Sequence, residues 1–317
     1  MFRGLTLIPL DVRIPFMRVH RYFFIFSTIV ILGSVALFTI KGLNYGIDFK
    51  GGILMEARLA KPADLGAMRG ALGGLDLGEV TLQEFGGPTD ILIRIERQKG
   101  DEKAQQQAVE RVKATLGPGI EYRRIEFVGP QVGKELFREG MIAIVVALAG
   151  IVAYIAFRFE WKFAICAIVA ELHDVLTTIG LFALFDLDFN LATVAALLAI
   201  AGYSINDTVV VLDRVRENLR KYKTMPLIEL FDLSINETLS RTVVTSGTTL
   251  LAVVALLIFG GPVIRDLNIA LLWGIGIGTY SSVCVAVPLL LYLKLDRRSM
   301  MAADKEAEGG TAVHRAP

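Results

Sequence analysis

The chain has 317 residues and a net charge of +1, which excludes a dominant electrostatic attraction to nucleic acid. Hydrophobic residues make up 54% of it and the mean hydropathy is +0.55, more apolar sequence than a soluble protein of this length needs for its core. Two cysteines, Cys166 and Cys284, lie inside apolar stretches, so we expect small packing residues and no disulfide framework.

The apolar residues are gathered in six runs of about 18–25 residues, long enough to cross about 30 Å of hydrocarbon as helices. The first run is too long for the apolar core of a signal peptide and is followed by no cleavage pattern of small residues, so we expect a retained anchor. The sequence therefore predicts a polytopic α-helical membrane protein. The six runs cover 22–40, 140–157, 163–185, 190–212, 242–259 and 267–293.

Basic residues near the ends of the runs predict the orientation, because cytoplasmic loops carry an excess of Lys and Arg. The N-terminal segment, the turn at 158–162 and the loop at 213–241 are rich in them, whereas the turns at 186–188 and 260–267 hold only Arg265. We expect both termini in the cytoplasm. The predicted organisation is a cytoplasmic segment 1–21, a transmembrane helix 22–40, an external domain 41–138, five transmembrane helices in 139–295, and a disordered tail 296–317.

The external segment 41–138 has the periodicity of a small α/β domain. Apolar residues alternate with period two at Ile53, at Val80, at Ile91 and at Ile125, and two helix faces lie between these strands. The order βαββαβ predicts a ferredoxin-like fold whose sheet has one face under its helices and one face open. The segment holds no Cys, His or phosphate-binding loop, so we expect no enzymatic activity there. The helix faces are Leu65, Met68 and Leu72, and then Ala108, Val109, Val112 and Leu116.

The stretch GIDFKGG, residues 46–52, lies between the first run and the first strand. It lacks the spacing of a nucleotide-binding P-loop and precedes a strand rather than a helix. We expect its glycines to let the backbone turn sharply from the membrane helix into the sheet.

Charged groups inside the third run are functional candidates, because burying them in a membrane costs about 2.5–3.5 kcal/mol each on insertion scales. Glu171 and Asp174 are three residues apart on one helix face, with His173 beside them, about 15–17 Å from the cytoplasmic end. One His with two carboxylates is a poor metal site. A hydrogen-bonded pair that packs two helices and a titrating proton relay both remain open.

The fourth run carries Asn206 and Asp207 before it ends. Asp207 is expected in the cytoplasmic third of the membrane, flanked by the polar Ser204 and Thr208. Arg214 falls near the same helix face, so an ion pair at the helix end is one interpretation. The polar cluster favours function, since it can hydrogen-bond both a charged and a neutral carboxyl group.

The fifth run opens with Arg241, which we expect at the start of its helix and at the depth of Asp207 on the neighbouring helix. Arg241 is either an ordinary positive-inside flank or a partner of Asp207. A nearby cation and desolvation act in opposite directions on a carboxylate, and their competition can make it switchable. The sixth run carries a small residue at every fourth position, including Gly274, Gly278 and Ser282, which predicts close helix packing.

Four stretches in this order and spacing resemble the SecF family, whose members form the smaller half of the SecD–SecF protein-export complex of bacterial inner membranes. They are GIDFKGG, the His173–Asp174 pair, GYSINDTVVVLDRVREN at 202–218, and RTVVTSGTTL at 241–250. The similarity covers about residues 20–295. It implies a fold related to the RND transporters, in which six helices form half of a twelve-helix bundle and SecD supplies the other half.

The resemblance also implies the function. Such subunits act with SecD, the SecYEG channel and SecA on a translocating unfolded polypeptide, and use the proton gradient, with no cofactor, to promote late-stage translocation across the inner membrane. Asp207 and Arg241 match the family's charged residues linked to proton conduction, and His173–Asp174 matches its HD pair; Asn206 adjoins them. Glu171 lies outside the pattern and is a hypothesis only.

Two other functions remain. One is a structural subunit that stabilises the translocon while its buried charges only join helices. The other is an RND-type exporter of small hydrophobic molecules, which the single six-helix half and the small external domain disfavour.

Overall fold

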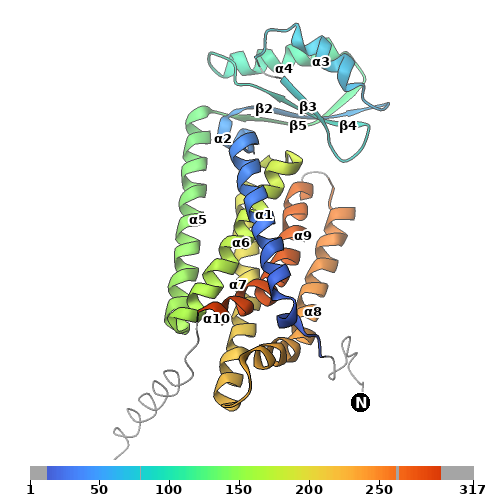
Figure 1. The fold of residues 1–317 in the computed structure, drawn as a ribbon. Helices are drawn as coiled ribbons and strands as arrows, with labels where there is room; N and C mark the ends of the chain where they lie inside the picture. The colour runs from blue at the N-terminus through green and yellow to red at the C-terminus, as the bar shows by residue number, and fades with distance from the viewer. Residues whose placement is uncertain (1–12, 79, 262–263, 294–317) are drawn as a thin grey trace, which may run out of the picture.

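A bundle of long helices carries an α/β domain at one end (Figure 1). The computed structural model describes residues 13–78, 80–261 and 264–293; residues 1–12 and the predicted tail 296–317 lie outside them. Within this part of the chain, six helices are long and apolar enough to span a membrane, which confirms the predicted membrane architecture. They are α1 (His20–Lys41), α5 (Pro130–Arg158), α6 (Trp161–Phe185), α7 (Leu191–Lys221), α8 (Leu227–Phe259), and α9 (Arg265–Ser281), which continues through a π-helical segment (Ser282–Ala286) into α10 (Val287–Tyr292).

Helices α6, α7 and α9 form the centre of the bundle, and α1 and α5 lie on its outside. In the most apolar stretches of α6 and α9–α10, 67% and 72% of residues are buried, against 11% in α1 and in α5. The outer helices expose large apolar side chains, as surfaces that face lipid or another membrane subunit do. Within the described part of the bundle, the buried carboxylates and the buried imidazole, Glu171, His173, Asp174 and Asp207, lie on α6 and α7.

Helix α8 begins at Leu227, so the expectation that Arg241 starts its helix was wrong. The first turns of α8 escaped the hydropathy analysis because they are polar on one side. Their apolar side is nevertheless buried, with Leu230 and Phe231 in the core, and Asp232 accepts a hydrogen bond from the Met17 backbone N–H at 2.8 Å. Likewise α5 begins at Pro130, a residue favoured in the first turn of a helix.

The α/β domain has the predicted order of elements, βαββαβ. It consists of β2 (Gly52–Leu59), α3 (Leu65–Gly73), β3 (Val80–Glu84), β4 (Asp90–Ile95), α4 (Glu102–Leu116) and β5 (Ile120–Val128), in an antiparallel sheet of order β3-β4-β2-β5. Helices α3 and α4 cover one face, and the other face is turned toward the bundle (Figure 1). The core between sheet and helices includes Ile53, Met55, Ile91 and Ile93, the residues whose alternation predicted the strands.

The connection between α1 and the sheet contains two elements that the sequence did not predict. Strand β1 (Asn44–Tyr45) pairs in parallel with β6 (Asp188–Phe189), which lies between α6 and α7, and a short helix α2 (Ile47–Lys50) follows. Gly52 then enters the sheet with φ +132°, where a Cβ would lie 2.7 Å from the Ile95 carbonyl oxygen. A side chain at this position would clash, which explains the need for glycine at the turn.

Candidate functional site

Asp207 lies where three helices meet inside the bundle. Its side chain projects from α7 and the residue is 7% exposed. The carboxylate accepts a hydrogen bond from Thr242 Oγ1 of α8 at 2.7 Å and from Ser282 Oγ, at the end of α9, at 2.6 Å. Hydroxyl groups can donate to a carboxylate and accept from a carboxylic acid, so this environment can satisfy both protonation states.

A second carboxylate, Asp174 of α6, is likewise held by hydroxyl groups, from α7 and α9. It accepts hydrogen bonds from Ser204 of α7 at 2.5 Å and from Ser281 of α9 at 2.7 Å. His173 Nδ1 lies 2.9 Å from Asp174 Oδ1, and neither residue is exposed by more than 1%. The structure therefore brings the His173–Asp174 pair and Asp207 into one polar interior joined by α7 and α9.

Consecutive serines at the junction of α9 and the π-helical segment bind the two carboxylates, because Ser281 donates to Asp174 and Ser282 to Asp207. The π-helical segment starts at Ser282, and such segments occur frequently at functional sites. The sequence singled out Ser282 for packing alone and missed both serine hydroxyls. The serines can be recognised as site residues only from their position opposite the buried carboxylates. This position depends on how the helices pack and is not visible in the local sequence.

The glycines of the small-residue stripe lie where α9 meets α7. A Cβ on Gly278 would lie 3.0 Å from Ser204 Cβ, and one on Gly274 would lie 2.3 Å from Ile200 Cγ1. Gly278 therefore allows Ser204 to approach α9 beside Asp174. Close packing at these two positions is what brings the serines of α9 within reach of the carboxylates.

The other predicted relay residues lie outside this network. Among the described residues, no hydrogen bond or ion pair joins Arg241 to Asp207; Arg241 is exposed on α8, and Asn206 is exposed on α7. Arg214 pairs with Glu217 at 2.7 Å and with Glu237 at 3.0 Å, so it does not reach back to Asp207. The described structure thus contains neither the direct Arg241–Asp207 contact nor the Arg214–Asp207 pair.

Glu171 and His173 carry buried polar atoms that lack partners. Glu171 is 4% exposed, and within the described part of the chain neither of its carboxylate oxygens nor His173 Nε2 has a hydrogen-bond partner. The same part of the chain contains no group of three His, Cys, Asp or Glu side chains arranged to hold a metal ion. The bundle interior is thus a site of carboxylates, hydroxyls and one imidazole.

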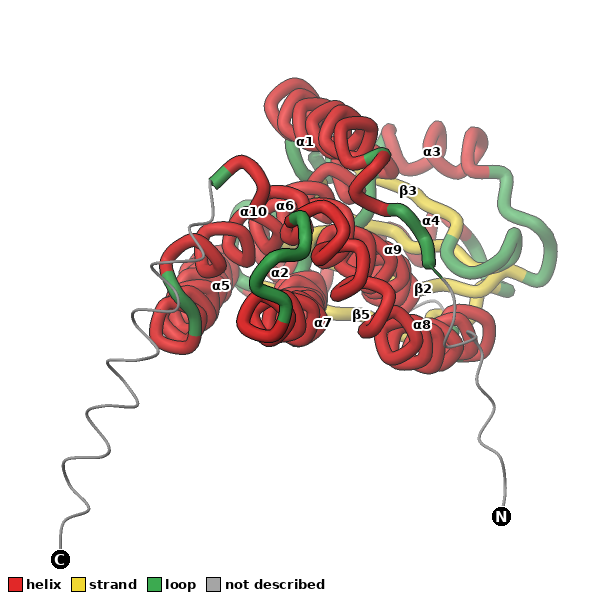
Figure 2. Tube along the Cα trace, turned by 60° about the horizontal axis from the view of Figure 1, so that its bottom comes forward, coloured by secondary structure: helices red, strands yellow, loops and turns green. Residues whose placement is uncertain are grey.

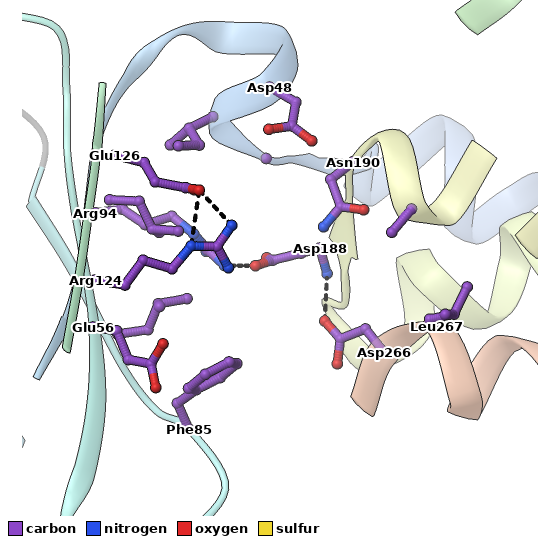
Figure 3. Close-up of a pocket in the computed structure, with 15 residues that line it drawn as sticks. Asp48, Glu56, Phe85, Arg94, Arg124, Glu126, Asp188, Asn190, Asp266 and Leu267 are labelled. Atoms are coloured by element: carbon purple, nitrogen blue, oxygen red, sulfur yellow. Dashed lines mark hydrogen bonds and ion pairs between the residues drawn. The ribbon is translucent and has the colours of Figure 1, made fainter. Parts of the chain in front are cut away.

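A buried ion pair joins the α/β domain to the bundle. Arg94 projects from β4 on the open face of the sheet and pairs with Asp188 of β6 (Figure 3). The Asp188 backbone N–H donates to Asp266 of α9 at 3.2 Å, and Asn44 Nδ2 donates to Asp188 Oδ1 at 3.0 Å. Burial lowers the pKa of Arg94 from its usual value, while Asp266 and Asp186 act in the opposite direction. The sequence analysis missed this contact, although a lone Arg between Ile93 and Ile95 was a signal.

Figure 2, turned so that the bottom of Figure 1 comes forward, shows α7 between α5 and α8, with the strands behind the helices. The α/β domain thus lies over the end of the bundle. Because α9 carries Asp266 at its first turn and Ser281 at its last residue, a single helix connects the ion pair at the domain with the two interior carboxylates.

Comparison with known proteins gives matches to one family over most of the chain. Residues 108–296 match the family model "Protein export membrane protein SecD/SecF, C-terminal", and residues 36–63 match the "SecD/SecF GG Motif". The chain is 45% identical over 316 residues to the protein translocase subunit SecF of Cereibacter sphaeroides, covering 97% of both chains. It is 47% identical over 291 residues to SecF of Magnetococcus marinus, covering 90% of this chain and 93% of the relative.

Two solved structures share the fold. The crystal structure of SecDF from Thermus thermophilus, a translocon-associated membrane protein, matches with a TM-score of 0.83 and 37% identity over 90% of this chain and 39% of the other. SecDF in a super-membrane-facing form matches with a TM-score of 0.67 and 38% identity, over 93% and 40%. This chain therefore spans about two fifths of the length of those SecDF chains.

Proposed function

Because this chain belongs to the SecF family of protein translocase subunits, we propose that it couples proton movement through its bundle to late-stage polypeptide translocation across the bacterial inner membrane. The observation that carries the proposal is the buried Asp207, held by the hydroxyls of Thr242 and Ser282. Each proton that crosses the full membrane supplies about 2.3 kcal/mol per 100 mV, so a few protons can bias a movement between two states.

In this mechanism Asp207 takes up and releases the proton, and Asp174 with His173 assists it. Loss of the charge on Asp207 changes which hydroxyls donate and which accept, so the contacts of α7 with α8 and α9 change with protonation. Helix α9 extends to the α/β domain through Asp266 and would transmit the change. The external domain would then alternately hold and release the substrate chain.

The assembly that we propose contains SecD as the second half of the bundle, together with the SecYEG channel, SecA and the unfolded polypeptide. The solved SecDF chains, of which this chain spans about two fifths, support the pairing with SecD. Arg241 is exposed on α8, so in our proposal it acts at the contact with the second half. In our proposal both termini lie in the cytoplasm and the α/β domain in the periplasm, which the excess of Lys and Arg in the loops on one side supports.

Asp207→Asn tests the proposal. The amide has the shape of the carboxyl group but cannot ionise, so we expect it to lower gradient-dependent polypeptide release at least tenfold while the complex still assembles. The measurement uses the complex with SecD and SecYEG in vesicles under an imposed proton gradient, with SecA and ATP driving the gradient-independent background. Unchanged release would favour the structural subunit, in which Asp207 only joins helices.

Thr242→Val should weaken the same step through the loss of one hydrogen bond to Asp207. A hydrogen bond to a charged group contributes about 1.5 kcal/mol or more, so we expect a decrease of about tenfold in gradient-dependent release. Thr245→Val, three residues along α8, is the matched control, because the Thr245 hydroxyl donates only to backbone carbonyl groups of its own helix. Equal effects of both changes would argue against a specific role for the Thr242 hydroxyl.

A further inference from the structure

A cavity of about 190 Å³ lies between the open face of the sheet and the domain end of the bundle (Figure 3). Leu54 and Glu56 of β2 line its sheet side, and Asp188 and Leu267 line its bundle side. About 10–15 Å³ of such space admits one water, so the cavity has room for several waters. One extended side chain fits this space, whereas a folded partner does not.

Acidic groups outnumber basic groups around the cavity. Two ion pairs, Arg94 with Asp188 and Arg124 with Glu126, balance four of the charges. Within the described residues, the remaining carboxylates form no ion pair. The ionisable lining residues are Asp48, Glu56, Glu126, Asp188, Asp266, Arg94 and Arg124. The cavity therefore has an excess of negative charge.

Glu56 is the group whose bonding is incomplete. Asp48 accepts the Leu191 backbone N–H at 3.1 Å, and Asp266 accepts the Asp188 backbone N–H at 3.2 Å. Glu56 is only 8% exposed, yet it makes no hydrogen bond or ion pair with any other described residue. Figure 3 shows its carboxylate directed from β2 into the cavity, beside Phe85.

A carboxylate in a largely enclosed site without a protein donor attracts a cation that can enter the site and pair with it. The nearest cation on the sheet does not fill this role. Arg124 is the cross-strand neighbour of Glu56, but its guanidinium is bonded to Glu126. A cationic partner for Glu56 would therefore come from outside the cavity lining and would replace the water that can occupy the cavity.

The apolar part of the lining indicates which kind of cation fits. Leu54, Leu92 and Leu267 line the cavity together with the carboxylates. Lys and Arg side chains combine an aliphatic stem with a charged end, so they match such a mixed lining. A bare divalent ion prefers six or more oxygen ligands, and no acidic cluster suited to a metal occurs in the described part of the chain.

We propose that this cavity binds the side chain of a Lys or Arg residue of the translocating polypeptide, with Glu56 as its charge partner. The assignment rests on the proposed function, because it takes the occupant to be the exported chain. A site that binds a single side chain does not read the sequence around it, so it can accept polypeptides of many different sequences.

The test measures peptide binding without a proton gradient. The complex with SecD is titrated against two fluorescent, unfolded peptides that differ only in a central Lys or Gln, and binding is followed by anisotropy. We expect the wild type to bind the Lys peptide about tenfold more tightly, since a charge-assisted hydrogen bond is worth about that factor. Glu56→Gln should abolish the difference. Glu121→Gln, on an exposed residue of β5 outside the cavity, should retain it.

Each alternative has its own result. A preference that survives Glu56→Gln, or no preference in the wild type, overturns the assignment and leaves Glu56 as a solvated carboxylate. If Glu56→Gln instead weakens the association with SecD at an unchanged peptide preference, the basic side chain belongs to the partner subunit and the substrate site is refuted. Asp207→Asn should keep the preference, so failure of the proton mechanism and failure of this site are distinguishable.

Discussion

Gly274→Val is expected to prevent the central helices from packing together. Even a Cβ at this position would lie 2.3 Å from Ile200 Cγ1 and 2.4 Å from its Cδ1, and valine adds two further methyl groups. Ile200 is buried in the core of α7, so it cannot move aside without displacing its neighbours. Overpacking of a core costs about 1–3 kcal/mol and more when the backbone must shift. We expect a loss at or above the upper end of this range.

Gly276→Val is the matched control, two residues along the same helix. Apart from the adjacent residues and the local backbone of α9, no atom of the described chain lies within 4 Å of a Cβ at this position. Both substitutions place the same β-branched residue in α9, so the difference between them isolates the contact with α7. The measurement is the melting temperature and the monodisperse yield of the purified complex. Equal melting temperatures would show that the α7–α9 contact is looser than the structure describes.

Arg94→Met is expected to release the α/β domain from the end of the bundle. The side chains of Arg94 and Asp188 are 14% and 15% exposed, and the substitution leaves the Asp188 carboxylate buried without its cation. Removing one partner of a buried pair costs about 3–5 kcal/mol. Because the pair joins two parts of the fold, we expect the loss as local opening at β1 and β6, with faster amide exchange there and little change inside the bundle.

Two further variants check the explanation of this effect. Arg97→Met removes an exposed arginine just after β4 and should leave amide exchange at β1 and β6 unchanged. Asp188→Asn in the Arg94→Met background removes the unpaired charge and should recover part of the loss, as a double-mutant cycle would measure. If exchange in Arg94→Met equals that of the wild type, the ion pair does not hold the domain in place.

The sequence predicted those parts of the fold in which a local period reflects burial. Ile91, Ile93 and Ile95 occur at alternate positions because β4 packs one face against α3 and α4. The apolar runs predicted the membrane helices because their length matches the thickness of the bilayer. Strands β1 and β6 were not predicted because each has only two residues, too few to show the alternation of apolar and polar residues that marks a strand. The first turns of α8 escaped because hydropathy averages over the polar and the buried side of a helix.

Prediction of the site reached the carboxylates but not their partners. Asp174 and Asp207 are conspicuous because charge is costly in apolar sequence. Serine and threonine are common in membrane helices, so nothing local distinguished Ser281, Ser282 and Thr242, which donate to these carboxylates. The expectation for Arg241 considered only its depth in the membrane and not the direction in which its side chain points from the helix. Thr242 faces Asp207, and Arg241, one residue earlier, points about 100° away from it.

The two adjacent serines of α9 also restrict how the bundle can move. Neighbouring residues of a helix point about 100° apart, so Ser281 and Ser282 reach their acids in different directions. A rotation of α9 about its axis therefore cannot strengthen both hydrogen bonds. A rotation that brings one serine closer to its carboxylate moves the other serine away from its own. The rotation of this helix therefore depends on the relative strength of the two hydrogen bonds, Ser281 to Asp174 and Ser282 to Asp207.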